Sequence, residues 1–193
     1  MSRTINLIVA ALCVGVSCPA SADPVRFVVN KEKSFLKFVA MQNNAPVTGK
    51  FTEFDADIVF DYDMLDKSRI VVTVATGSLE TSTKETRQTV TQHEWLAVEK
   101  FPKATFHTTK ISKIPSTWDY YAEGELTLKG KTAPIQMNFQ IEDFEDMAIA
   151  EGSATIKRSD YAVGEGEWAK DDVVQNQVRV EFRIVADKKA IEQ

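Results

Sequence analysis

The sequence predicts an all-β fold of about eight antiparallel strands with one short helical insertion. Three observations support this prediction. Apolar and polar residues alternate through most of residues 25–187, turn-forming residues separate the alternating segments, and only residues 83–100 break the rule. Because neighbouring side chains of a strand point to opposite faces of a sheet, the alternation indicates strands with one buried face.

The alternation is clearest near the end of the chain. Val178, Val180 and Phe182 share one face of the predicted strand, and charged residues lie between them. Gly130 lies in the short link between the fifth and sixth segments, as expected for a hairpin. The eight predicted strands are, in chain order, 25–41, 48–61, 68–80, 103–113, 119–129, 133–142, 148–159 and 174–187.

The exception, residues 83–100, has loosely spaced apolar residues. Val90, Trp95 and Val98 fit no period-2 pattern, and Pro102 closes the segment. We therefore predict one helix or helical turn there.

The first residues have the features of a secretory signal. Arg3 supplies a positive charge, residues 5–16 are apolar, and residues 19–22 offer a small-residue cleavage site before Asp23. The apolar run is shorter than the roughly 20 residues of a transmembrane helix. We expect residues 1–22 to be a cleaved signal peptide, and residues 23–193 to form one domain in the periplasm.

Both cysteines, Cys13 and Cys18, lie in the expected signal peptide, so the mature domain would have no thiol, disulfide or thiolate metal site. Gly15 makes lipid anchoring through Cys18 an unfavoured alternative. Loss of Arg3 leaves 22 basic and 28 acidic residues, a net charge of −6. Such a surface disfavours nucleic acid and anionic membranes as partners.

Eight strands can form a two-sheet sandwich or close into a barrel that is filled by side chains or holds a small ligand. An outer-membrane barrel would need apolar residues on its outside. The polar faces are instead densely charged, so the apolar faces are expected to point inward.

Several short motifs, in their order and spacing, resemble the YceI-like family over nearly the whole mature chain. They are Ser34 with Phe38, Gly49-Lys50-Phe51 with Phe54, Ser78-Leu79 with Thr81, Trp95-Leu96 with Phe101-Pro102 and Phe106, Gly124 with Leu126-Thr127-Leu128 and Gly130, and Arg158-Ser159-Asp160-Tyr161 with Val163-Gly164, Gly166 and Trp168.

The resemblance implies a lipocalin-like eight-stranded barrel in the periplasm that holds an isoprenoid lipid, such as a polyprenyl lipid or a quinone tail. The family often has two aromatic residues in place of Trp95-Leu96, and Trp or Tyr in place of Phe27, which leaves the pocket's shape open. It also occurs beside b-type cytochromes, so an accessory, non-enzymatic role for a membrane cytochrome is the alternative. An enzyme that acts on the bound lipid is a third and weaker hypothesis.

An isoprenoid tail needs a long apolar site with few polar groups. The same alternation would arise if the inward residues merely filled a solid core, so the pattern leaves open whether the barrel is hollow. The candidate lining residues are Phe38, Phe51, Ile58, Phe60, Val72, Val74, Phe106, Leu126, Leu128, Met137, Phe139 and Phe182.

The last two strands are joined by about 14 residues, 160–173, far more than a hairpin needs. We expect this loop at the barrel mouth, with Arg158, Tyr161 and Trp168 near the lipid head group. Arg158 could meet a phosphate or carbonyl. Alternatively, Arg158 pairs with Asp160 or a neighbouring strand, and Trp168 merely plugs the barrel.

Enzyme and metal sites are not expected. Asp61, Asp63 and Asp66 lack the Gly and Glu of a calcium loop and are expected to form a solvated turn. Glu165 and Glu167 fix no carboxylate separation for a glycosidase and are expected on a polar rim. The two histidines, His93 and His107, are expected on the surface. We therefore predict a non-enzyme without a cofactor; whether it is a monomer or a homodimer stays open.

Overall fold

The computed structural model describes residues 25–115, 117 and 119–189. The expected signal peptide and its cleavage site lie outside these residues. The strands are β1 (Val25–Val29), β2 (Phe35–Gln42), β3 (Ala45–Phe51), β4 (Phe54–Phe60), β5 (Arg69–Ala75), β6 (Leu79–Thr81), β7 (Lys103–Lys113), β8 (Asp119–Leu128), β9 (Lys131–Asp143), β10 (Met147–Lys157) and β11 (Val174–Lys189). The helices are α1 (Lys84–Thr91) and the short 3-10 turns η1 (Leu65–Lys67), η2 (Thr76–Ser78), η3 (Arg158–Tyr161) and η4 (Gly166–Trp168).

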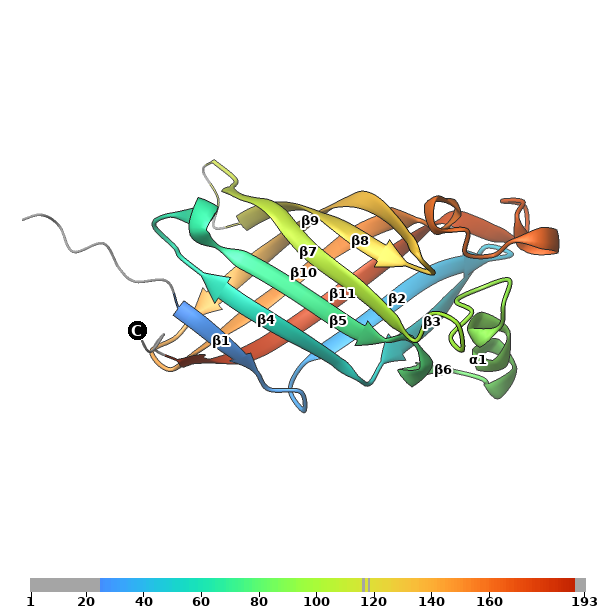
Figure 1. Cartoon of the computed structure of the whole chain (residues 1–193), viewed down its shortest axis with the longest axis horizontal. Coiled ribbons are helices and arrows are strands. Elements are labelled where there is room, and N and C mark those ends of the chain that lie inside the picture. Colours follow the sequence, from blue (N-terminus) through green and yellow to red (C-terminus); the bar gives the residue numbers. More distant parts are fainter. Residues whose placement is uncertain (1–24, 116, 118, 190–193) are drawn as a thin grey trace, which may run out of the picture.

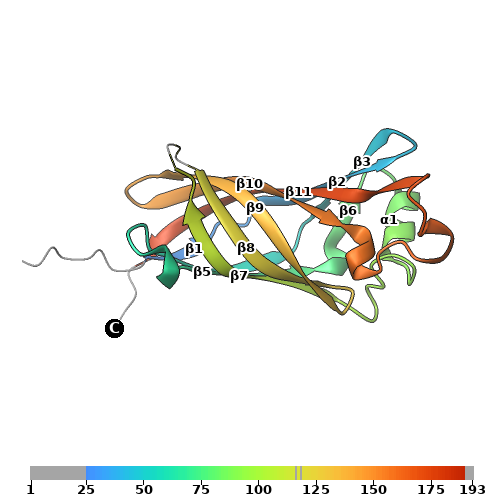
Figure 2. The same ribbon diagram turned by 90° about the horizontal axis from the view of Figure 1, so that it is seen from above.

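The strands close into an antiparallel barrel (Figures 1 and 2). Neighbours run in the order β1-β4-β5-β7-β8-β9-β10-β11, and pairing of β1 with β11 closes the ring. The strands β2, β3 and β6 extend β1, β4 and β5, because β2 also pairs with β11 and β3 pairs with both β2 and β6. Within the described residues this gives eight long strands, so the predicted eight-stranded barrel is confirmed.

Three of the eight predicted strands are bent rather than continuous. Residues 25–41 break at a turn where the hydroxyl of Ser34 donates to the Asn30 carbonyl at 2.7 Å. Residues 48–61 break at residues 52–53, and η2 interrupts residues 68–80. Alternation cannot reveal these corners, because the inward face continues beyond each bend.

The hairpin between β2 and β3 is longer than predicted. Asn43 and Asn44 have φ angles of +48° and +61°, which fits the tight two-residue turn typical of hairpins. Lys129 and Gly130 form a similar turn between β8 and β9, with φ angles of +49° and +73°. The sequence analysis therefore placed the link at Gly130 correctly. Between the first two predicted strands it expected a link of six residues, 42–47, whereas the structure has a turn of two residues, Asn43 and Asn44.

The helical insertion is also shorter than residues 83–100. Thr83 caps α1, because its hydroxyl oxygen accepts a hydrogen bond from the Thr86 backbone N–H at 3.1 Å. Residues 92–100 form turns instead. None of the helices among the described residues is long and apolar enough to cross a bilayer.

Candidate functional site

A cavity of about 470 Å³ runs through the barrel. Its wall reaches from Phe27 and Ile141 at one end to Gln42 and Val90 at the other. The 11 residues of β7 span roughly 36 Å at about 3.3 Å per residue. With the usual strand tilt of about 40°, this is roughly 28 Å along the barrel axis. The cavity is therefore a long tunnel rather than a compact pocket.

All twelve lining candidates from the sequence lie on the tunnel wall. Four of them, Phe60, Val74, Phe106 and Phe139, are buried. The other eight are only half-buried although they face inward, because the tunnel leaves one side of each free of protein. These eight are Phe38, Phe51, Ile58, Val72, Leu126, Leu128, Met137 and Phe182. The barrel is hollow, and the binding role of these residues remains a prediction.

Inward-facing glycines make room for the aromatic rings of the wall. A Cβ added to Gly49 would lie 2.5 Å from the ring of Phe38. At Gly124 it would lie 2.4 Å from the ring of Phe106 and 2.4 Å from the carbonyl of His107. The rings thus lie flat over positions that have no side chain, which keeps the tunnel open beside them.

One end of the tunnel is closed by packed rings, here called the floor: Phe27, Phe60, Tyr62, Tyr120 and Phe139. The ring of Tyr120 lies 5.4 Å from that of Phe139 in a stacked pair and 5.4 Å from that of Phe60 in an edge contact. Four of these residues, Phe27, Phe60, Tyr120 and Phe139, are buried in one core cluster, and Tyr62 packs against it. The floor therefore ends the tunnel on the side of β1 and the β9–β10 turn.

The floor is anchored by polar contacts at its rim. Tyr62 donates its hydroxyl hydrogen to Asp143 at 2.8 Å, and its pKa is raised by burial and by that carboxylate. Asp61 accepts hydrogen bonds from the backbone N–H groups of Asp63 and Met64 at 3.0 and 2.8 Å. The expected solvated turn is thus only partly right, because Asp61 is 2% exposed and holds the turn from inside.

The opposite end is covered by α1, by the turns of residues 92–100 and by the loop of residues 158–173, together called the lid (Figures 1 and 2). The side of α1 towards the tunnel consists of Glu85, Thr86, Thr89 and Val90. No residue of α1 is buried, so its packing on the barrel is slight. The loop of residues 158–173 thus lies at the mouth, where the sequence placed it.

Two tryptophans meet in the lid. The rings of Trp95 and Trp168 lie 5.6 Å apart, and both line the tunnel. They come from the turns after α1 and from the loop after β10, so this contact joins the turns of residues 92–100 to the loop of residues 158–173. Trp168 is half-buried and lies at the tunnel's end, which fits a lid or a plug equally well.

Arg158 is 3% exposed and its guanidinium group is fully engaged inside the lid. Its five N–H groups have five backbone carbonyl partners at 2.9–3.3 Å, and burial lowers its pKa. These carbonyls belong to Val163, Gly164, Lys170, Val174 and Gln175. The structure therefore places Arg158 as a clamp that shapes the loop, with no N–H left for a phosphate. It forms no ion pair with Asp160 or another described carboxylate, but it does bind the neighbouring strand β11 through the carbonyls of Val174 and Gln175, as the alternative proposed.

Tyr161 also lies inside the lid rather than on the tunnel wall. It is 1% exposed and belongs to a core cluster with Leu79, Leu96 and Ile156. Burial raises its pKa to about 12. Its expected contact with a head group has no support in this arrangement.

Lys129 fixes the lid from the β8–β9 turn, a role that the sequence analysis missed. Its ammonium group donates to the carbonyls of Ala162 at 2.6 Å and Glu94 at 3.2 Å, and to the carboxylate of Glu165 at 2.8 Å. This hydrogen bond lowers the pKa of Glu165. The partners are 33 to 36 residues from Lys129, so no local pattern could reveal them.

The remaining candidates lie on the outside. His107 points outward and lies 3.5 Å from the carboxylate of Glu125, and His93 is exposed in a turn after α1. Glu165 and Glu167 are exposed, as a polar rim requires. Across residues 25–115, 117 and 119–189, no group of three or more His, Cys, Asp and Glu residues could hold a metal ion.

The tunnel wall includes residues that were not among the twelve lining candidates. Ile135, Val178, Val180 and Ile184 belong to the same alternating sets and could have been found by extending them. The contribution of α1 had no such signal, because its sequence KETRQTVT has a single apolar residue. Polar residues of the mouth were thus the part that alternation could not predict.

Comparisons with known proteins agree on the fold. A model described as the YceI-like domain matches residues 27–186. A UPF0312 protein of Pectobacterium atrosepticum is 26% identical over 170 residues, which cover 84% of this chain and 88% of that protein. The crystal structure of BcnA from Burkholderia cenocepacia has a TM-score of 0.77 at 28% identity, covering 81% of this chain and 98% of that one.

A more distant structure, a polyisoprenoid binding domain from Saccharophagus degradans implicated in plant cell wall breakdown, has a TM-score of 0.64 at 15% identity. The match covers 86% of this chain and 99% of that domain. At this identity the likeness shows the shared barrel fold.

Proposed function

Because this chain belongs to the YceI-like family, we propose that its barrel binds the tail of an isoprenoid lipid, such as a polyprenyl lipid or a quinone, and carries it through the periplasm. The observation that carries the proposal is the hollow tunnel of about 470 Å³. Its size lies within the 300–1,000 Å³ range common for ligand sites. Its length suits a chain better than a compact ligand.

The chemistry of the wall supports an apolar chain. The twelve lining residues predicted from the sequence are all hydrocarbon, aromatic or thioether side chains. Burial of apolar surface contributes about 25 cal/mol per Å² before the costs of binding. An uncharged tail therefore gains free energy along the whole tunnel, whereas a polar chain would lose its hydration without gaining partners. The polyisoprenoid binding domain that shares this fold supports the same choice of ligand.

Transport through the periplasm rests on the expected signal peptide. N-terminal sequencing of exported protein should begin at Asp23, and its folding should be insensitive to reducing agents, because both cysteines precede this residue. Exported protein that begins at Met1 would contradict this part of the proposal.

The function is tested by organic extraction and mass spectrometry of protein purified from its native host. We expect a prenyl lipid or quinone at close to one molecule per chain. An empty barrel that co-purifies with a cytochrome would instead favour the accessory role.

A pair of variants locates the lipid. Leu126→Glu places a carboxylate on the tunnel wall, where it has no partner, and should remove the lipid. Thr127→Glu makes a similar change at the next position of β8, on the other face, and should leave the lipid in place. Full lipid content in folded Leu126→Glu protein would show that the tunnel is not the site.

A further inference from the structure

The two ends of the tunnel differ in polarity. The floor is made of packed rings, and the residues that line the tunnel there are aromatic or aliphatic apart from the hydroxyl of Tyr62, which is bound to Asp143. The lid contributes Glu85, Thr86 and Thr89. A lipid with one polar end would therefore place its tail against the floor and its head group under α1.

The tunnel wall at the mouth has one acidic and one basic side chain, and only the basic one is engaged in hydrogen bonds that the structure shows. Of the described residues that line the tunnel, Glu85 and Arg158 are the ones with ionised side chains at neutral pH. The guanidinium group of Arg158 already donates hydrogen bonds to five backbone carbonyls. Glu85, which is exposed, is therefore the charged residue of the wall that stays available to a head group.

The start of α1 does not offer an anion site either. A helix N-terminus attracts anions through its free N–H groups. In α1 the N–H of Thr86 already donates to the hydroxyl of Thr83 at 3.1 Å, and the N–H of Arg87 to the carbonyl of Thr83 at 3.2 Å. Glu85 adds a negative charge in the same turn. The positive end of this helix is thus partly compensated by the hydroxyl of Thr83 and the charge of Glu85.

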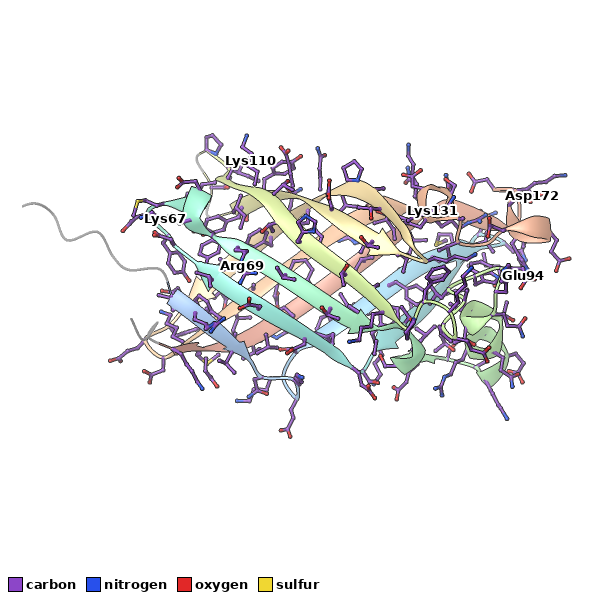
Figure 3. All side chains as sticks on the ribbon, in the orientation of Figure 1. Lys67, Arg69, Glu94, Lys110, Lys131 and Asp172 are labelled. Carbon is purple, nitrogen blue, oxygen red and sulfur yellow. The ribbon has the colours of Figure 1, made fainter. Side chains whose placement is uncertain are left out.

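Lys84 and Arg87 of α1 are exposed and do not line the tunnel, and the buried lysine at the lid end is engaged. Lys129 is buried and holds two carbonyls and Glu165. Figure 3 shows the labelled Glu94, Lys131 and Asp172 towards this end of the molecule, and the labelled Lys67 and Lys110 at the opposite end. The wall at the mouth offers the carboxylate of Glu85, the hydroxyl groups of Thr86 and Thr89 and the unpartnered indole N–H of Trp95, and none of its described residues offers a free cationic group.

We propose that the mouth selects an uncharged head group with hydroxyl donors, as in a polyprenol or a quinol, and rejects the phosphorylated form of the same lipid. The inference rests on the proposed lipid-binding function and adds its head-group specificity. A hydroxyl group donates to the carboxylate of Glu85 or to the oxygens of Thr86 and Thr89. A phosphate, with about −1.5 to −2 charge at pH 7, meets a like charge and finds no free cationic donor on the wall.

The test compares two ligands with one tail, geranylgeraniol and geranylgeranyl phosphate, on lipid-free protein of residues 23–193. Binding is followed by quenching of tryptophan fluorescence, since Trp95 and Trp168 line the mouth. The alcohol should bind at least about tenfold more tightly, a difference of about 1.4 kcal/mol. The ratio should shrink as ionic strength rises, because salt screens charges at an exposed mouth.

Matched variants assign the selectivity. Glu85→Lys should reverse or abolish the preference, and Glu85→Gln should reduce it. Glu145→Lys makes the same change of charge at an exposed position in the β9–β10 turn at the floor end, and should keep the wild-type ratio.

The outcomes separate this inference from the function on which it rests. Equal affinities, tighter binding of the phosphate, or an unchanged ratio in Glu85→Lys would refute the head-group specificity alone. If neither compound binds, the lipid-binding function itself is refuted and the specificity with it.

Discussion

Replacement of Arg158 by lysine tests whether this residue shapes the lid or contacts a ligand. The arginine makes five hydrogen bonds to backbone carbonyls, all within the segment of residues 163–175. A lysine has three N–H donors, so at least two carbonyls lose their partner. A hydrogen bond to a charged group contributes about 1.5–3 kcal/mol. Two lost bonds therefore predict a loss of about 3–6 kcal/mol in the free energy of unfolding.

The assay is urea unfolding of lipid-free protein, with the midpoint and slope compared between Arg158→Lys and the wild type. The lower limit of about 3 kcal/mol corresponds to a fall of roughly 6–12 °C in the melting temperature for a domain of this size. Arg179→Lys is the control. Arg179 is 60% exposed and forms a surface ion pair with Glu181, so the change should have little effect.

Two results would refute the reasoning. A loss below about 1 kcal/mol would mean that the carbonyls find other donors, such as water, at no cost. A variant of normal stability that loses its lipid would show that Arg158 contacts the lipid head group, as expected from the sequence. The predicted result is the reverse, a destabilised protein that keeps its lipid while it is folded.

Three further predictions follow from the barrel and its lid. Gly124→Ala should destabilise the barrel by about 1–3 kcal/mol in urea unfolding, because the new Cβ would lie 2.4 Å from the carbonyl of His107. The control Gly77→Ala should leave the stability unchanged, because a Cβ at Gly77 would have no atom within 4 Å. Equal effects of the two variants would contradict the packing argument. The pKa of Glu165 is lowered by the hydrogen bond from its lysine partner, so its stabilising effect is present above the ordinary pKa of 4.5 and is lost as pH falls through the lower folded value. Glu165→Gln should thus weaken the protein near pH 7, and the difference from the wild type should vanish once pH lies below the folded pKa of Glu165; a constant difference would contradict the ion pair. Hydrogen exchange should be faster in α1 than in residues 158–164, because α1 buries no side chain; slower exchange in α1 would overturn this order.

The barrel could be predicted because strands encode their buried face locally. Every second residue of 178–184 faces the tunnel, and the same holds for 135–141. Closure into a ring and the bends of the strands depend instead on pairing between distant segments, such as β1 with β11. The hollow interior also has no local signature, because it depends on how rings such as Phe106 lie over glycines such as Gly124 on the neighbouring strand.

The lid residues were harder to assign for a related reason. Arg158 was identified as a candidate by its type and its place before a long loop, but its role depends on carbonyls up to 17 residues away. Lys129 has partners at even larger separations and a positive φ angle that a lysine seldom adopts. Side chains that bind backbone groups leave no pattern in the sequence, because any residue can supply a carbonyl.

The two parts of the lid are held by different forces, and this difference suits a tunnel that must admit a long chain. The loop of residues 158–173 is tied down by the buried cations Arg158 and Lys129, whose bonds would be costly to break. The helix α1 buries no side chain and is held by its cap at Thr83, by the partly buried Val90 and by backbone hydrogen bonds from Leu96 and Val98 to its last turn. A segment with few buried contacts opens at low free energy while its surroundings stay folded. The fixed loop can then keep the mouth in shape while α1, which bears Glu85, moves to let a lipid pass.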